Sequence, residues 1–155
     1  MTKKTFNQKL NHAGDLPKVE STDDPRFAAR YGGSKMLIAA PLDYDAVMKR
    51  VPEGWLITSE TLRAFLAGRA GADFTCPLTA GIFINIAANA SEERAGVDPT
   101  PYWRTLRAKG ELNEKFPGGV NGHRARLEAE GHIVIQKGKR FFVRDYEKAA
   151  WPIEG

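Results

Sequence analysis

A dense run of apolar residues between positions 77 and 89 constrains the fold of this chain more than any other feature. Thr75 is a typical helix N-cap and Pro77 is tolerated in a first turn, so the run predicts a helix over about residues 77–89. Its apolar residues are Leu78, Ile82, Phe83, Ile84 and Ile86. Because they cover more than one face, the helix has to be buried on more than one side, and the rest of the chain has to build a core around it.

Three further segments carry helix signals of their own. The predicted helices run from Asp43 to about Val51, from Thr58 or Ser59 to about Gly68, and from roughly Asn121 to Glu130. Asp43 and Thr58 have side-chain oxygens that cap a helix start, and Gly131 is a typical helix stop. The chain is therefore predicted to be mainly helical.

Two short alternating segments follow these helices, at residues 132–136 and 141–145. The basic turn Lys137-Gly138-Lys139-Arg140 joins them, and the pattern predicts a β-hairpin. Two helices joined by a turn, a further helix and a terminal hairpin form the element order of a winged helix-turn-helix domain. The predicted fold is thus mainly α, a winged helix-turn-helix-like domain with a small C-terminal β-hairpin.

The N-terminal part of the chain has a different character. Residues 1–35 alternate short polar stretches with glycine and proline, which predicts a weakly ordered or extended arm. The apolar run 36–40 is stopped by Pro41 and is either a strand or a tethering segment. We therefore expect an N-terminal arm at 1–35 and one DNA-binding-type domain over 36–155.

The composition excludes several classes of protein. One cysteine cannot form an internal disulfide, and with three scattered histidines it cannot build a structural zinc site. No apolar run approaches the roughly 18 residues of a membrane span, and the start of the chain lacks a signal-peptide core. We expect a monomeric cytoplasmic protein without a metal, a cofactor or a membrane partner.

The net charge of +4 is unevenly distributed along the chain. Residues 1–35 hold 7 basic and 4 acidic groups, residues 36–101 hold 5 and 8, and residues 102–155 hold 11 and 7. Basic ends suit contacts with nucleic-acid phosphates. The acidic middle opposes such contacts unless the basic ends fold over it.

Several short motifs between Tyr44 and Gly131 follow one another at the spacing of a known family. They are Val51-Pro52-Glu53-Gly54, Ile57-Thr58-Ser59, Pro77-Leu78-Thr79-Ala80-Gly81, Pro101-Tyr102-Trp103-Arg104, Gly110, Phe116-Pro117-Gly118-Gly119 and Leu127-Glu128-Ala129-Glu130-Gly131. On these motifs the segment resembles the DNA-binding domain of the methylguanine-DNA methyltransferase family and its alkyltransferase-like relatives. The resemblance implies that the recognition helix begins at Pro77 and that residues 101–104 occupy the active-site motif Pro-Cys-His-Arg.

The positions that carry the family's chemistry depart from its pattern. Tyr102 stands in place of the alkyl-accepting cysteine and Trp103 in place of the activating histidine, while Glu130 keeps the glutamate that holds the histidine. A phenol with a pKa of about 10 and no adjacent base is a poor acceptor at neutral pH. Gly81 corresponds to the family's arginine finger, and Ser59 to the tyrosine that helps rotate the target nucleotide. The resemblance therefore implies a protein that transfers no alkyl group.

Alkyltransferase-like proteins replace the acceptor cysteine and still bind alkylated guanine. This implies a base pocket formed by Tyr102, Trp103, Arg104 and Glu130, in which Tyr102 stacks on the base. The alternative is a packing cluster that anchors the loop to the last helix, since tyrosine and tryptophan bury large areas around one polar tip.

The other candidate DNA contacts lie on the helix-turn-helix and on the hairpin. They are Thr58, Ser59, Thr79, Gly81, Asn85, Asn89, Lys137, Lys139 and Arg140. The hairpin cations are equally consistent with a solvated turn whose lysines discourage edge-to-edge strand pairing.

Two functions remain open on this sequence. The first is a non-catalytic DNA-binding protein that recognises alkylated or distorted duplex DNA in DNA repair, with duplex DNA and a repair protein as partners. The second is a protein-interaction or structural module on the same scaffold that has lost DNA binding. Homology alone would suggest the name methylated-DNA–protein-cysteine methyltransferase, which the residues at positions 102 and 103 do not support.

Overall fold

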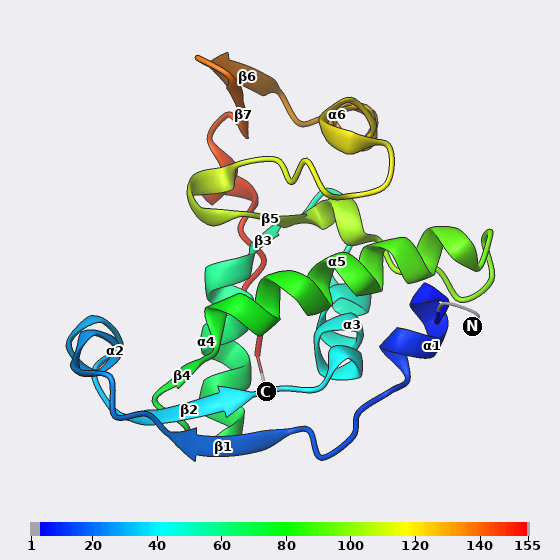
Figure 1. Cartoon of the computed structure of the whole chain (residues 1–155). Coiled ribbons are helices and arrows are strands. Elements are labelled where there is room, and N and C mark those ends of the chain that lie inside the picture. The colour runs from blue at the N-terminus through cyan, green and yellow to red at the C-terminus, as the bar shows by residue number, and fades with distance from the viewer. Residues whose placement is uncertain (1–3, 155) are drawn as a thin grey trace.

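The long apolar helix lies at the centre of the structure. The computed structural model describes residues 4–154, and in it α5 (Pro77–Glu93) crosses the middle of the molecule (Figure 1). It packs against α1 (Phe6–Leu10), α3 (Pro41–Arg50) and α4 (Ser59–Ala70). Its buried residues are Ala80, Ile84, Ala87, Ala88, Ala90 and Ser91. The prediction of a helix buried on more than one side is confirmed.

The start of α5 differs from the prediction. Cys76 is the N-cap rather than Thr75, and the helix runs on to Glu93 instead of ending near residue 89. Thr75 belongs to the short strand β4 (Phe74–Thr75), and its hydroxyl donates to the carbonyl of Arg63 at 2.7 Å. Its hydroxyl therefore bonds to α4 and does not cap α5.

The two helices before α5 lie where the capping signals placed them, with small shifts. α3 begins two residues before Asp43, and the Asp43 carboxylate accepts the Ala40 N–H at 2.8 Å as part of a capping arrangement. α4 is capped by Thr58, whose hydroxyl accepts the Thr61 N–H at 3.2 Å. It ends at Ala70, slightly beyond the predicted stop, and Gly71 is its C-cap in the left-handed conformation.

The N-terminal arm, predicted to be weakly ordered or extended, contains two helices and a strand within residues 4–34, and its first three residues lie outside the part of the chain that the structure describes. α1 lies against the far end of α5, where Leu10 is buried in the core. The Asn7 side chain donates to the Ala90 carbonyl at 3.0 Å, and the Glu93 carboxylate accepts the backbone N–H groups of Phe6 and Asn7. Burial of one apolar residue together with these hydrogen bonds holds the segment on the helix.

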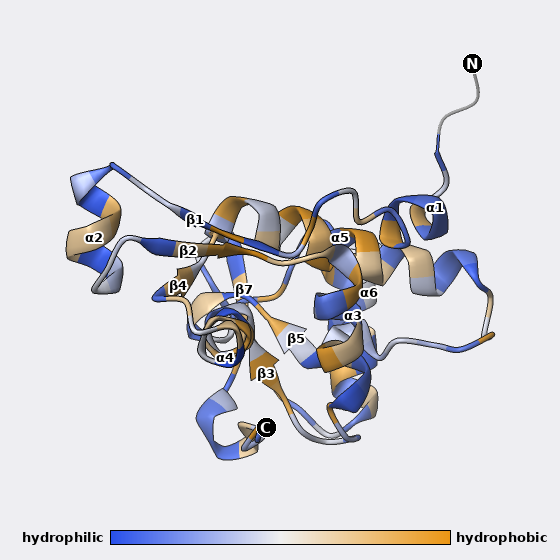
Figure 2. Ribbon diagram, turned by 90° about the horizontal axis from the view of Figure 1, so that it is seen from below, coloured by the Kyte–Doolittle hydropathy of each residue, from blue (hydrophilic) through white to orange (hydrophobic). Residues whose placement is uncertain are grey.

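A small sheet also joins the N-terminal segment to the rest of the fold. β1 (Lys18–Ser21) pairs antiparallel with β2 (Lys35–Ile38), which pairs parallel with β4. Between β1 and β2 the chain forms α2 (Pro25–Tyr31), and the Tyr31 ring stacks on Phe74 with centroids 4.5 Å apart. The apolar run at 36–40 is therefore mainly a strand. Figure 2 shows apolar residues concentrated on β2, β3 and α5.

The C-terminal part forms a second, smaller core. The elements around it are β3 (Ile57–Thr58), η1 (Tyr102–Arg104), β5 (Thr105–Leu106), η2 (Ala108–Gly110), α6 (Gly119–Ala129), β6 (Val134–Lys137), β7 (Arg140–Val143) and η3 (Tyr146–Ala149). Ile57 of β3 and Tyr102 of η1 pack in the main core around α5. β3 and β5 pair in parallel, and β6 and β7 form the predicted terminal hairpin. Leu56, Leu106, Leu112, Leu127, Val134 and Val143 fill this core. None of the described helices is long and apolar enough to cross a membrane.

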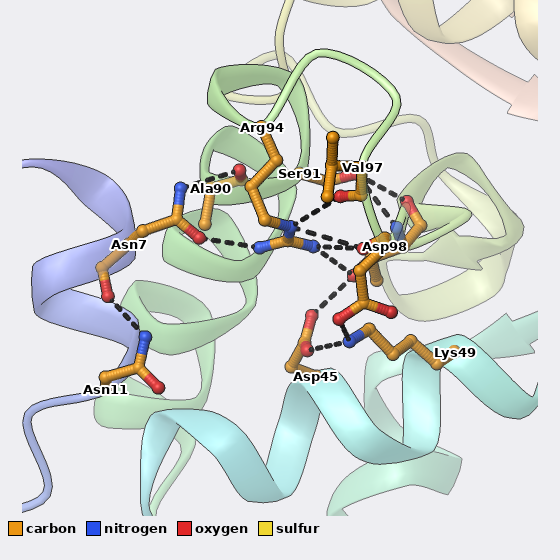
Figure 3. A network of polar contacts seen from close by, with 10 residues as sticks. Asn7, Asn11, Asp45, Lys49, Ala90, Ser91, Arg94, Val97 and Asp98 are labelled. Atoms are coloured by element: carbon orange, nitrogen blue, oxygen red, sulfur yellow. Dashed lines mark hydrogen bonds and ion pairs between the residues drawn. The ribbon is translucent and has the colours of Figure 1, made fainter.

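A polar network fixes the loop that follows α5 (Figure 3). Arg94 donates to the Asn7 side chain at 2.8 Å, to the Asp98 carbonyl at 2.8 Å and to the Thr100 hydroxyl at 3.1 Å. Thr100 in turn donates to the buried Asp45 carboxylate at 2.6 Å. The network ties α1, α3 and the end of α5 together, which sets the position from which the chain enters η1.

Candidate functional site

Glu130, the C-cap residue of α6, joins that helix to η1 through its carboxylate. Glu130 accepts a hydrogen bond from Trp103 Nε1 at 2.8 Å, from Arg104 Nη2 at 2.8 Å and from the Gly54 N–H at 3.0 Å. Arg104 also donates through Nη1 to the Val51 carbonyl at 2.8 Å. The side chains of Arg104 and Glu130 are only 14% and 7% exposed. The structure thus brings together three of the four residues predicted for the base pocket.

The electrostatics of this group favour an ionised carboxylate. Burial disfavours the charged form of Glu130, but the hydrogen bonds from Arg104, Gly54 and Trp103 outweigh it and lower the pKa of the carboxyl group below its usual value. Removing Arg104 would leave the largely buried carboxylate without its compensating charge. The arrangement therefore fixes η1 to α6 and to the turn before β3.

Tyr102 packs beside this group in the core and makes no hydrogen bond to Glu130. Its side chain is 2% exposed, and its ring meets Trp103 and Phe116 edge-on with both centroid distances at 5.3 Å. The hydroxyl donates to Glu92 Oε1 at 2.7 Å, and burial together with that hydrogen bond raises the pKa of the phenol. The packing-cluster alternative describes the surroundings of Tyr102 in this structure, and its predicted stacking role stays a prediction.

A hollow of about 440 Å³ opens beside the first turns of α5, and we call it the α5 hollow. The predicted contact residues Ser59, Gly81 and Asn85 line it, and Phe116 contributes an aromatic wall. A Cβ atom added to Gly81 would meet nothing within 4 Å, so the helix backbone is open there. The Thr105 hydroxyl, from another lining residue, has no hydrogen-bond partner in the described structure.

The other predicted residues of the helix-turn-helix lie outside this hollow. Thr58 caps α4, and Thr79 donates to the Cys76 carbonyl at 3.5 Å. Asn89 donates to the Asn85 carbonyl within α5. All three are occupied by local hydrogen bonds, which gives them structural roles in this conformation.

Three cations that line the α5 hollow were not predicted as site residues. Arg63 comes from α4, Arg107 follows β5, and Lys115 lies in the loop before α6, while Glu114 is the one acidic residue of the lining. None of the ion pairs found among residues 4–154 involves these three cations. Their sequence signal is weak, because they are separated along the chain and come together only in the folded structure.

The basic hairpin borders a second hollow of about 800 Å³, which we call the hairpin hollow. Lys137 and Arg140 line it together with Lys109 and Arg107, so Arg107 is common to both hollows. Arg140 is partly neutralised, because its guanidinium pairs with Glu111 through two hydrogen bonds of 3.0 Å. The predicted cation Lys139 is exposed at the tip and belongs to neither lining.

The site offers no set of metal ligands in the part of the chain that the structure describes, since no three His, Cys, Asp or Glu side chains come together there. The α5 hollow instead presents Arg63, Arg107 and Lys115 beside the exposed apolar side chains at the start of α5. Such a surface suits an anionic polymer with apolar faces better than a small charged substrate.

The fold is that of the alkyltransferase-like proteins. The crystal structure of S. pombe Atl1 in complex with damaged DNA containing O6-carboxymethylguanine matches with a TM-score of 0.53 and 14% sequence identity, over 73% of this chain and 94% of that chain. A crystal structure of S. pombe ATL in complex with DNA matches over the same shares with a TM-score of 0.50 and 14% identity. No protein-family model and no curated protein sequence matches the chain. The resemblance suggested by the motifs is thus confirmed as a likeness of fold.

Proposed function

We propose that the protein is a non-catalytic DNA-binding protein that recognises alkylated or distorted duplex DNA. In this proposal α4 and α5 act as a helix-turn-helix, the start of α5 faces the DNA, and the β6–β7 hairpin is a wing. The observation that carries it is the group of cations Arg63, Arg107 and Lys115, which line the α5 hollow and make none of the ion pairs found within residues 4–154, on the fold of proteins solved with DNA. Unpaired lysines and arginines along one face are the electrostatic footprint of duplex binding.

The surroundings of Tyr102 support a function without alkyl transfer. Burial and the bond to Glu92 raise the pKa of its hydroxyl, so the nucleophilic phenolate is scarce at neutral pH. Glu130 accepts hydrogen bonds from Trp103 and Arg104, and the indole of Trp103, which stands in the place of the activating histidine, cannot act as a general base. The protein therefore flags or binds DNA rather than repairing it by itself.

The proposed lesion class is O6-alkylated guanine, as in the DNA bound by S. pombe Atl1. Because Tyr102 is buried, an extruded base would lie in the α5 hollow, between Gly81 and Phe116. Gly81 has no side chain that could make polar contacts inside the stack, so we expect a modest lesion preference and a binding energy that comes mainly from phosphates.

The test is titration of the protein into fluorescently labelled duplexes that differ only in one O6-methylguanine, at several salt concentrations. We expect binding to both duplexes, a steep fall in affinity with rising salt, and tighter binding to the alkylated duplex. Failure to bind either duplex at low salt would overturn the proposal and favour the protein-interaction module. Equal affinity for the two duplexes would remove the lesion from the proposal and leave only general duplex binding.

A further inference from the structure

The most exposed large apolar side chain in the described structure belongs to the start of α5. Leu78 is 73% exposed, and Ile82, one turn further along the same helix, is 49% exposed. Gly81 lies between them with open space around its Cα atom. All three line the α5 hollow, so the surface offered at this point is an apolar edge next to a gap.

We propose that Leu78 is an apolar wedge that inserts between stacked bases of bound DNA, with Gly81 leaving room for the displaced nucleotide. The inference rests on the proposed function, because it requires that duplex DNA is the occupant of the α5 hollow. Leucine and isoleucine wedges are a common means by which proteins unstack a base step and bend the duplex.

The charges around Leu78 indicate DNA as the occupant. Arg63, Arg107 and Lys115 line the same hollow and make none of the ion pairs found within residues 4–154, against the single acidic residue Glu114. An apolar side chain inside a rim of cations matches the two surfaces of a duplex, charged phosphates outside and apolar base faces within.

The position of Leu78 in the helix also suits a wedge. It follows Pro77, the first residue of α5, so it projects from the beginning of the helix rather than from its middle. The helix behind it is held by the buried Ala80 and Ile84. A side chain on a helix anchored in the core is held in position when it inserts between bases, whereas a side chain on a loop could be displaced.

The wedge is tested with a duplex that carries the fluorescent base 2-aminopurine next to an O6-methylguanine, since 2-aminopurine brightens when it is unstacked. We expect saturating wild-type protein to raise the fluorescence, and Leu78→Ala to lose most of that rise while still binding the duplex. Leu42→Ala is the matched control, because Leu42 is 44% exposed on α3 and lies outside the α5 hollow.

A second variant separates the wedge from simple charge. Leu78→Lys adds a cation at the same place, so we expect it to bind the duplex with a salt slope steeper by about 1 and yet fail to brighten 2-aminopurine. A fluorescence rise in both Leu78 variants equal to that of the wild type overturns the wedge and leaves DNA binding intact. Binding by the wild type without any rise has the same consequence, whereas absence of binding at low salt overturns the proposed function and the wedge with it.

Discussion

At the scale of single residues, the carboxylate of Glu130 is the most heavily used polar group of the site. Glu130→Gln removes the charge that Arg104, 14% exposed, is paired with. We expect the free energy of unfolding to fall by about 3 kcal/mol, because a buried cation loses its partner. Urea denaturation measures the change. Glu128→Gln is the matched control: Glu128 pairs with Arg124 on the exposed face of α6, so its loss costs about 0.5 kcal/mol or less.

His123 gives the protein a second pH-dependent group. Burial lowers the pKa of its imidazole to about 4, and the neutral ring accepts the Asn113 N–H through Nδ1 while Nε2 donates to the Trp103 carbonyl. Between about pH 6.5 and pH 4 the unfolded chain binds a proton that the folded chain refuses, so stability falls as the pH falls through this range.

We expect this loss to amount to about 3 kcal/mol over the full range, as judged from the size of the pKa shift. Unfolding by urea at a series of pH values measures it. In His123→Gln most of the slope above pH 5 should disappear and a smaller part should remain, because burial also lowers the pKa of His132. A substitution of the exposed His12 should leave the slope unchanged. Below this range the lowered pKa of Glu130 adds a further loss of stability as that carboxylate is protonated.

A third prediction at this scale concerns alkyl transfer. Tyr102 is buried and hydrogen-bonded to Glu92, so we expect no covalent adduct after incubation with duplex DNA that carries O6-methylguanine. Intact-protein mass spectrometry checks this, and it also reports on Cys76, the one cysteine of the chain. A stoichiometric gain of one methyl group on either residue would contradict the non-catalytic function.

At the scale of elements, α1 is part of the core and not an appendage. Leu10 is 3% exposed in the cluster built around α5, so Leu10→Ala is expected to destabilise the protein by about 2–5 kcal/mol. Thermal unfolding shows the effect as a lower Tm. Val19→Ala on the exposed side of β1 is the control and should change the Tm little, since Val19 is 47% exposed. An equal shift in the two variants would mean that α1 does not contribute to the core.

At the scale of the whole molecule, Arg107 is the point at which the two hollows meet. We expect Arg107→Ala to weaken binding to all duplexes alike and to reduce the salt slope by about 1, because one phosphate contact is lost. Arg124→Ala is the matched control, since Arg124 lies on α6 outside both hollows and pairs with Glu128. Fluorescence anisotropy at several salt concentrations measures both, and identical slopes would place the DNA elsewhere on the protein.

The hairpin belongs to the same scale, because its contribution depends on neighbours far along the chain. Lys139 is exposed, whereas Arg140 pairs with Glu111 and has to exchange that partner for a phosphate. The cations of the basic turn, which look equivalent in the sequence, therefore differ in the structure in whether they have an acidic partner. Local composition indicates the presence of cations, but not which of them already have an acidic partner.

The sequence by itself determined the elements that depend on neighbours along the chain. Helix caps, the apolar run of α5 and the hairpin turn are local signals, and most lie within a few residues of where they were predicted. The resemblance placed Glu130 beside the residue in the histidine position, and Trp103 at that position donates to it in the structure, whereas the hydrogen bond from Arg104 had no signal in the sequence.

Only the tertiary structure decided which of these residues are exposed and which meet. It buried Tyr102 against Phe116, folded residues that looked like an arm onto α5 and β2, and gathered Arg63, Arg107 and Lys115 at one hollow. Burial and the proximity of charges depend on contacts between residues far apart in the chain. Hydrophobic periodicity selects the face of a helix that is buried, but the partner of that face is chosen by packing.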